Sequence, residues 1–287
     1  MQALTADAGF LAERGSGQIA QVFNRAVNLW LPARRRWLTL LSESCDNAPN
    51  SCRLALTHFD ASFQPGQSIE LHHHGVMVAD KLKIDTLSCR CWQPPDLTLS
   101  RERFRQIPWL KLRDIILQQL QKHDTLFLGG GNNPFYQAIS EQLQRNREIL
   151  FKALRGNLNI TSAVTQMIGL GIGLTPSSDD YLVGMSAILF IPGHPAAHLR
   201  DEFISALACA GKNTTSLSAT TLEAAFDYRY RENIYAFIAS LINDPRQLSE
   251  KNIADIKSIG SSSGCDMLFG MADGCALSQT YGGNYVS

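Results

Sequence analysis

The spacing of apolar residues changes once along the chain, and this change does most to limit the possible folds. In residues 21–92, short apolar or alternating runs recur at intervals of about ten residues, separated by Pro, Gly, Asn and Asp, as in strands joined by turns. Helical patterns do not separate these runs, which disfavours βαβ units. We therefore predict a β-rich antiparallel domain, closed or curled into a barrel-like sheet, over residues 1–98.

A segment with two adjacent prolines, residues 93–100, ends the strand pattern, and helical spacing follows it. Leu112, Ile116 and Leu120 fall at the spacing of one buried helix face. We predict a mainly α-helical domain over residues 99–287, and hence an α+β fold. Helices are expected at residues 101–122, 134–155, 160–168, 178–190, 196–211, 218–231, 232–242, 250–258 and 263–277, and a short strand at residues 125–128.

Charge and composition exclude several classes of protein. Twenty-six basic residues offset twenty-six acidic ones, so no overall field draws the chain to nucleic acid or to an anionic membrane. With 45% hydrophobic and 18% charged residues, the chain is globular rather than disordered. The longest apolar run, residues 181–191, is too short to cross a membrane. The first residues lack a secretory pattern and the seven cysteines are scattered, so we expect reduced thiols and a cytoplasmic location.

The sequence GLGIGLTPSSDDYLVG, residues 169–184, is the most informative for function. Its alternating glycines permit positive φ and expose N–H groups, so the loop can cradle an anion. Ser177 is expected to cap the next helix, with Asp180 at the third helical position. A cap does not require Asp179, because adjacent acids repel, whereas a bound cation or a proton-transfer role would explain it. Ordinary capping stays open as an alternative, and neither a Walker A nor a dinucleotide-binding pattern is present.

A similar pattern recurs near the C-terminus. Residues 177–185, SSDDYLVGM, and 263–271, SGCDMLFGM, share a Ser, an Asp three residues later, a Leu and a Gly-Met pair. Because a glycine lies one turn after each Asp, we predict two crossing helices with adjacent N-termini. Two such N-termini favour a phosphate or carboxylate, which Asp180 and Asp266 would flank. Two capped helices packed through small residues are the alternative.

Three other segments are weaker candidates for a site. The HHH run at residues 72–74 and the pair Cys89 and Cys91 would supply zinc ligands, although a polar strand face explains them as well. The GGGNNP run at residues 129–134 predicts either a second anion-binding turn or a plain tight turn. The KNTTS run at residues 212–216 supplies a cation and hydroxyls, or simply caps a helix.

Four motifs together resemble one protein family, and they span most of the chain. They are Arg25-Ala26-Val27-Asn28-Leu29, Gly173-Leu174-Thr175-Pro176-Ser177-x-Asp179-Asp180, Asn213-Thr214-Thr215-x-x-Ser218 and Gly260-x-x-Ser263-Gly264-x-Asp266-x-Leu268-x-Gly270. The sequence is similar to the AllH family, whose named member is a subunit of oxamate carbamoyltransferase. It departs from the family pattern at Ser178, where relatives often have glycine, and at Ser261, where the pattern has histidine. A paralogue with another substrate therefore stays open.

The resemblance implies a cytoplasmic subunit in anaerobic allantoin or purine breakdown that acts with FdrA-like and AllG-like partners. Such an assembly moves a carbamoyl group between oxalurate and phosphate, giving oxamate and carbamoyl phosphate. On this reading, the backbone of residues 169–177 and the start of the second helix bind phosphate or the oxalurate carboxylate. Asp179 or Asp180 would hold Mg²⁺ or take a proton, and Asp266 would orient the substrate amide.

The sequence thus predicts a specific set of site residues. Asp179, Asp180 and Asp266 are the expected catalytic residues, and the first two are also candidate Mg²⁺ ligands. The expected substrate- or phosphate-binding residues are Gly171, Gly173, Thr175, Ser177, Ser262, Ser263, Gly264, Asn132, Asn133 and Thr215. A non-catalytic subunit that binds a small carboxylate or acts as a scaffold is the alternative. A metal-dependent hydrolase would need a converging histidine, and no H-x-H or H-E-x-x-H motif supports one.

Overall fold

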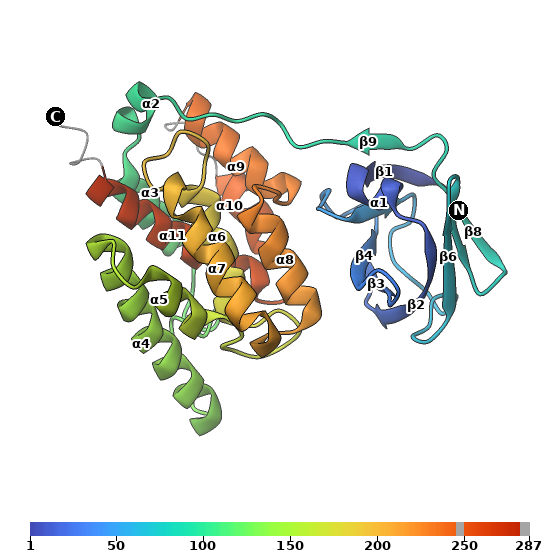
Figure 1. Cartoon of the computed structure of the whole chain (residues 1–287), viewed down its shortest axis with the longest axis horizontal. Helices are drawn as coiled ribbons and strands as arrows, with labels where there is room; N and C mark the ends of the chain where they lie inside the picture. Colours follow the sequence, from blue (N-terminus) through green and yellow to red (C-terminus); the bar gives the residue numbers. More distant parts are fainter. Residues whose placement is uncertain (245–249, 282–287) are drawn as a thin grey trace. The chain divides into compact units, whose positions relative to one another are not determined.

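A computed structural model describes residues 1–244 and 250–281 of the chain (Figure 1). The described residues divide into two compact units. The first consists of residues 1–95 together with 230–232, and the second contains the rest. Strands belong to the first unit and helices dominate the second, which confirms the predicted α+β class.

The first unit is a curled sheet with the strand order β8-β7-β6-β2-β3-β4-β5-β1-β9. Its elements are β1 (Ala3–Asp7), α1 (Ala8–Ala12), β2 (Gly15–Val22), β3 (Ala26–Leu31), β4 (Arg36–Leu41), β5 (Ser51–Leu54), β6 (Ser68–His72), β7 (Gly75–Val78), β8 (Leu82–Asp85) and β9 (Arg90–Trp92). Most neighbours are antiparallel, as predicted, but β4–β5 and β1–β9 are parallel. The prediction missed these two pairs because irregular segments, rather than recognisable helices, make the connections.

Main-chain bonds before β1 explain the curl of this sheet. The Met1 amino group donates to the Lys83 carbonyl at 2.9 Å, and the Asp85 amide donates to the Met1 carbonyl at 2.9 Å. The chain that enters β1, near one end of the strand order, therefore also bonds to β8 at the other end. Side chains such as Ile19, Leu29 and Leu38 are fully buried and form the core of the sheet.

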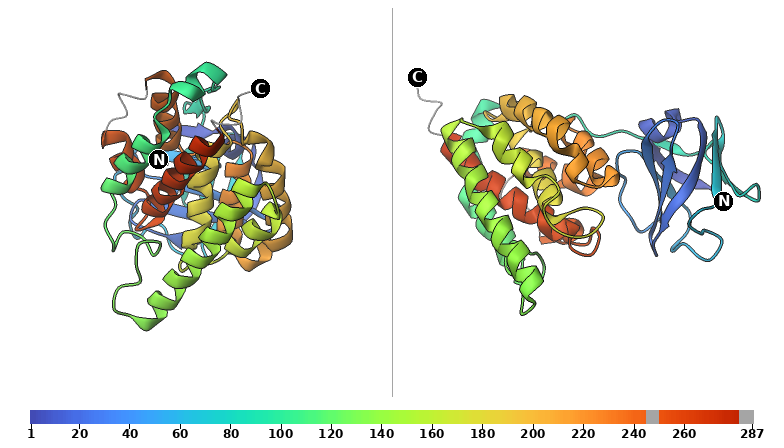
Figure 2. Two further views of the ribbon diagram at one scale, coloured as in Figure 1. Left: turned by 90° about the vertical axis from the view of Figure 1, so that its left-hand side faces the viewer. Right: turned by 60° about the horizontal axis from the view of Figure 1, so that its bottom comes forward.

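The second unit is a bundle of helices, shown from two further directions in Figure 2. Its elements are α2 (Arg101–Gln106), α3 (Trp109–Gln118), α4 (Pro134–Gly156), α5 (Ile160–Met167), α6 (Ser177–Leu189), η1 (Ala197–Leu199), α7 (Arg200–Ala210), η2 (Gly211–Asn213), α8 (Ser216–Phe226), α9 (Glu232–Asn243), α10 (Glu250–Lys257) and α11 (Ser263–Tyr281). Every residue of α6 is buried, and so are most residues of α11. These two helices pack against each other and form the centre of the bundle.

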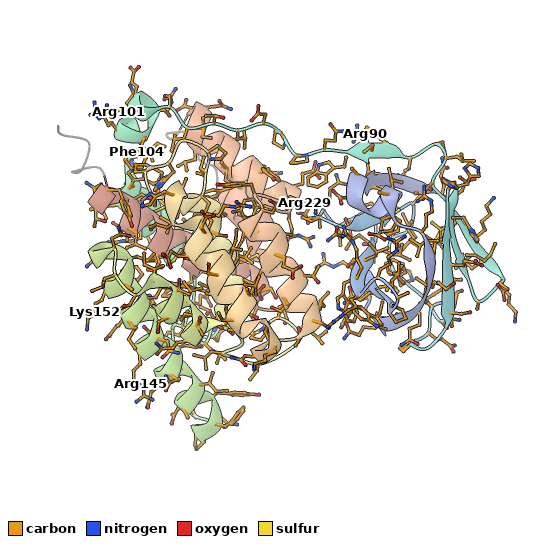
Figure 3. All side chains as sticks on the ribbon, in the orientation of Figure 1. Arg90, Arg101, Phe104, Arg145, Lys152 and Arg229 are labelled. Atoms are coloured by element: carbon orange, nitrogen blue, oxygen red, sulfur yellow. The ribbon has the colours of Figure 1, made fainter. Side chains whose placement is uncertain are left out.

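The surface helix α4 shows how burial follows sequence in this bundle. Its 23 residues bury one face through Leu143 and Leu150. Arg145 and Lys152 are exposed, and Figure 3 shows both on the outside of the helix. Polar residues on one face and leucines on the other are the amphipathic pattern of a helix at a protein surface.

Three local predictions are wrong. The helix expected over residues 101–122 is broken into α2 and α3 at Pro108, because proline lacks an N–H and disfavours a helical residue before it. Residues 125–128 form turns rather than a strand, since the Thr125 hydroxyl accepts the Phe127 amide at 3.1 Å and the Thr125 carbonyl accepts the Leu128 amide. Ser177 is the first residue of α6, and Pro176 takes the cap position without a side-chain bond.

Candidate functional site

The helices α6 and α11 cross through two glycines. A Cβ added to Gly184 would lie 1.9 Å from the Met267 carbonyl oxygen, and one added to Gly270 would lie 2.0 Å from the Tyr181 carbonyl oxygen. Neither position has room for a side chain, so glycine is what allows the two backbones to approach. This confirms the predicted close crossing of the two helices.

The N-terminal ends of these helices meet through a pair of hydroxyls. Thr175 lies just before α6 and Ser263 begins α11, and their side-chain oxygens are 3.0 Å apart. Both residues are half-buried. The predicted adjacency of the two N-termini is therefore confirmed. Several of the first N–H groups are already bonded within the chain, since the Ser178 amide donates to the Leu170 carbonyl and the Gly264 amide to the Ile259 carbonyl.

Asp180 lies beneath this hydroxyl pair and is only 2% exposed. Its Oδ2 atom is buried and has no hydrogen-bond partner among the described residues. Burial raises the pKa of Asp180 from 3.8 to about 8, while the hydroxyls of Ser263 and Thr175 act in the opposite direction and the charge of Asp266 adds to the rise. A carboxyl group with this pKa is mostly protonated at neutral pH and can donate a hydrogen bond or a proton.

Asp266 occupies the matching place on α11 and is 1% exposed. The Thr125 hydroxyl donates to its Oδ1 atom, and burial raises its pKa to about 7 despite hydrogen bonds from Thr125 and Ser177. Sequence reasoning missed Thr125, which lies 141 residues before Asp266 and in a segment predicted as strand.

Asp179 has a different environment from Asp180. Its Oδ1 accepts the Gly169 amide at 2.8 Å, and its Oδ2 accepts the Ser218 hydroxyl at 2.6 Å as well as the Thr214 hydroxyl. Burial raises its pKa, and these donors oppose the rise. One side chain thus joins the start of the glycine loop to the segment that begins α8.

The loop before α6 adopts the backbone that its glycines predict. Gly169, Gly171 and Gly173 all have positive φ, at 84°, 131° and 93°. A Cβ on Gly169 would lie 2.2 Å from the Asn213 carbonyl oxygen, so that position also requires glycine for packing. Thr215 donates to the Leu174 carbonyl at 2.5 Å and caps α8 by accepting the Ser218 amide. The binding of an anion by this loop stays a prediction.

The remaining predicted site residues have mainly structural contacts. The main-chain carbonyl of Ser262 accepts the Asp266 amide at 2.9 Å, and Gly264 leaves room for the Ile256 carbonyl of α10. Asn133 caps α4 by accepting the Phe135 amide at 2.9 Å. Asn132 is exposed, and in the described part of the chain no hydrogen bond joins either asparagine to the buried acids. Their role in binding stays a prediction.

A partly buried ion pair lies along the same crossing, and sequence reasoning missed it. Arg147 of α4 forms two bonds to the carboxylate of Asp273 of α11, one of them 2.7 Å long. The Tyr181 hydroxyl also donates to Asp273, at 2.7 Å, and the Tyr181 ring stacks on Phe127 at 4.6 Å. Tyr181, the residue after Asp180, is thereby held at its hydroxyl by Asp273 and at its ring by Phe127.

The other candidates and cavities lie elsewhere in the described chain. Within residues 1–244 and 250–281, no three His, Cys, Asp or Glu side chains are grouped as metal ligands, and residues 73–74 form the turn between β6 and β7. A cavity is lined by residues 157, 159–162 and 202, and none of the three acids is part of this lining.

The described helices include none that is long and apolar enough to span a bilayer.

Comparison with known proteins gives two family matches. Residues 167–275, which contain the glycine loop and all three acids, match a family described as oxamate carbamoyltransferase subunit AllH. Residues 2–91 match the AllH family N-terminal domain. No solved structure matches the chain.

Proposed function

The chain belongs to the family of the oxamate carbamoyltransferase subunit AllH, and we propose that it forms the small-anion site of such an enzyme. In this proposal, the complete enzyme transfers a carbamoyl group between oxalurate and phosphate, with oxamate and carbamoyl phosphate as the other pair. FdrA-like and AllG-like subunits are the proposed partners. The N-terminal ends of α6 and α11 are the proposed location of the site.

The unpaired oxygen of Asp180 is the observation that carries the proposal. Leaving a buried polar atom without a partner costs on the order of 1–3 kcal/mol of stability. An aspartate with a purely structural role gives no reason for this cost, whereas a ligand that bonds to the free oxygen does. A protonated carboxyl group next to two helix N-termini is suited to receive an anion and to donate a proton to it. The half-buried hydroxyls of Thr175 and Ser263 add donors for the same anion.

The three acids take different roles in this proposal. Asp180 donates the proton that the leaving amide nitrogen of oxamate requires when oxalurate is cleaved. Asp266 accepts a hydrogen bond from the substrate amide and so orients it. Asp179 is a positioning residue, because its carboxylate already accepts three hydrogen bonds that shape the glycine loop.

One observation favours a second candidate function, a binding or scaffold subunit. Asp180 and Asp266 are 2% and 1% exposed, so the acids lie below the surface of the isolated chain. In that case the chain binds the small carboxylate and a partner subunit supplies the reacting groups.

Reconstitution with partner subunits tests both functions. Carbamoyl transfer from carbamoyl phosphate to oxamate is measured with the wild-type chain, with Asp180→Asn and with the surface control Asp114→Asn, which alters an exposed acid of α3. We expect Asp180→Asn to abolish turnover while the complex still assembles, and Asp114→Asn to leave it unchanged. Near-normal turnover with Asp180→Asn would refute the proposed proton transfer and favour the scaffold function.

A further inference from the structure

Residues 124–128, which we call the Thr125 segment, form turns between α3 and α4 and carry a hydroxyl donor to Asp266. The Thr125 hydroxyl accepts the Phe127 amide at 3.1 Å and donates to Oδ1 of Asp266. A hydroxyl has a single hydrogen, so this donation is the one that Thr125 can make. Its strength therefore depends on where the segment holds Thr125.

A lysine of α10 fixes the segment at its N-terminal end. The Lys257 ammonium donates to the Asp124 carboxylate at 2.6 Å and to the Gln119 carbonyl at 2.8 Å. The same carboxylate oxygen of Asp124 accepts the Gln121 amide at 2.8 Å. Lys257 thus bonds to the chain on both sides of residues 120–123, and it holds the residue directly before Thr125.

Helix α4 fixes the segment from the other side. The Ser140 hydroxyl donates to the Leu126 carbonyl at 2.7 Å, and the side chain of Gln144, one turn later, donates to the Phe127 carbonyl. The hydroxyl donor to Asp266 therefore lies between an anchor on α10 and two anchors on α4.

The ion pair of Lys257 and Asp124 has little effect on Asp266 through its charges. Opposite charges 2.6 Å apart largely cancel at a distance. Burial raises the pKa of Asp266, hydrogen bonds from Thr125 and Ser177 lower it, and the ion pair adds no charge effect of its own. An influence of Lys257 on Asp266 must therefore pass through the position of Thr125.

We propose that Lys257 is a positioning residue of the acid site, which through Asp124 holds Thr125 against Asp266 and so keeps that carboxylate oriented and ionised. The proposal rests on the proposed function, because there Asp266 accepts a hydrogen bond from the substrate amide. A misplaced or protonated Asp266 would accept that bond less well. The proposal adds to the site a lysine of α10 that does not itself contact either acid.

Other charged groups lie on the helices that pack against α11. Within the site, burial raises the pKa of Asp180 of α6, and the charge of Asp266 adds to the rise. Ion pairs on the neighbouring helices join Arg147 of α4 to Asp273, Arg113 of α3 to Asp114, and Lys251 of α10 to Asp255. Asp180 is therefore the acid whose titration must be separated from that of Asp266.

The pKa of Asp266, measured by NMR titration of the purified chain with ¹³C-labelled aspartate, tests the proposal without any activity. Asp180→Asn serves as the background for every titration, and the signal that is lost on adding Asp266→Asn identifies Asp266. Thr125→Val removes the donor and keeps a similar shape. It should raise the pKa of Asp266 by about one unit or more, as expected for one hydrogen bond to a charged group.

Two variants of the ion pair separate position from charge, because they remove opposite charges. Lys257→Met and Asp124→Ala both release the Thr125 segment from α10, so each should raise the pKa of Asp266. A direct effect of charge would instead make Asp124→Ala lower it. A lowered or unchanged pKa in Asp124→Ala would therefore overturn the proposal. The control Lys251→Met, which alters an exposed lysine of the same helix, should leave the pKa unchanged.

A double-mutant cycle tests whether Lys257 acts through Thr125. In the Thr125→Val protein, Lys257→Met should shift the pKa of Asp266 no further, because the bond through which it acts is already absent. The same shift with and without the Thr125 hydroxyl would refute the proposal. Circular dichroism checks the fold of each variant, and Asp124→Ala supplies the test if Lys257→Met does not fold.

Failure of this proposal is distinguishable from failure of the proposed function. With Asp180 present and partner subunits added, Lys257→Met should reduce carbamoyl transfer and move the acid limb of its pH profile to higher pH. Carbamoyl transfer together with unshifted pKa values in the titrations would refute the positioning role alone. The expected pKa shifts in a chain whose complex transfers no carbamoyl group would refute the proposed activity alone.

Discussion

Replacing Asp180 by Asn should make the protein less sensitive to alkaline pH, in addition to any effect on activity. Burial raises the pKa of Asp180 from 3.8 to about 8. Between these values the folded state holds a proton that the unfolded state has lost. The free energy of unfolding of the wild type therefore falls as pH rises through this range.

The size of the effect follows from the same two values. Each pH unit between these two pKa values changes the free energy of unfolding by about 1.4 kcal/mol for one proton. Asp180 should therefore lower the free energy of unfolding of the wild type by on the order of 4 kcal/mol between pH 5 and pH 8. Asn at this position does not titrate, and the variant lacks that loss. Asp266 titrates in the same direction and its charge contributes to the raised pKa of Asp180, so the comparison reports on the coupled pair of acids.

Urea unfolding, followed by circular dichroism at several values from pH 5 to pH 8.5, measures the difference. The stability curves of wild type and Asp180→Asn should diverge with rising pH, with the variant the more stable at pH 8. The control Asp114→Asn should follow the wild type, because Asp114 is exposed. Parallel curves for wild type and Asp180→Asn would show that Asp180 ionises normally, and would remove the physical basis of the proposed proton donor.

Three further perturbations test the packing around the site. Gly184→Ala should destabilise the fold by roughly 1–3 kcal/mol, because the added Cβ would meet the Met267 carbonyl. The control Gly156→Ala, at an open position, should not destabilise the fold. Urea unfolding compares the two variants. Asp273→Asn should cost about 1–3 kcal/mol in the same assay, since it removes the carboxylate that accepts two bonds from the half-buried Arg147. Burial lowers the pKa of His194 to about 3, so between pH 7 and pH 5 the wild type should lose about 2 kcal/mol of stability relative to His194→Gln, because only the unfolded state gains the proton. The same pH dependence in both proteins would contradict this.

The central helix pair was predictable because its signals are local and occur twice. An Asp followed by Gly one turn later, in two apolar segments, was enough to predict the crossing and the adjacent N-termini, and both are confirmed. Most strands of the first unit were similarly predictable from their short runs and turns, but β1 and most of β2 lie before residue 21, where the predicted strand pattern begins. The parallel pairs in the sheet were not, because pairing between strands depends on connections that leave no periodic signal.

Other parts of the site were not predictable from local patterns. Thr125 contacts Asp266 across 141 positions, and no spacing rule links a threonine in a turn to a distant helix. The environments of Asp179 and Asp180 differ although the residues are adjacent, because successive helical residues point about 100° apart and meet different neighbours. The ion pair of Arg147 and Asp273 depends on how α4 packs against α11, which the sequence of either helix alone does not determine.

The three hydrogen bonds accepted by Asp179 have a consequence for local unfolding. Its side chain links Gly169 of the glycine loop to Thr214 and Ser218 at the start of α8, and these two segments are distant in the sequence. Neither of these segments can detach without breaking a bond to the same carboxylate, so they should open together rather than one at a time. In native-state hydrogen exchange, the amides of the glycine loop and of the first turn of α8 should therefore exchange as one cooperative unit with a single opening free energy.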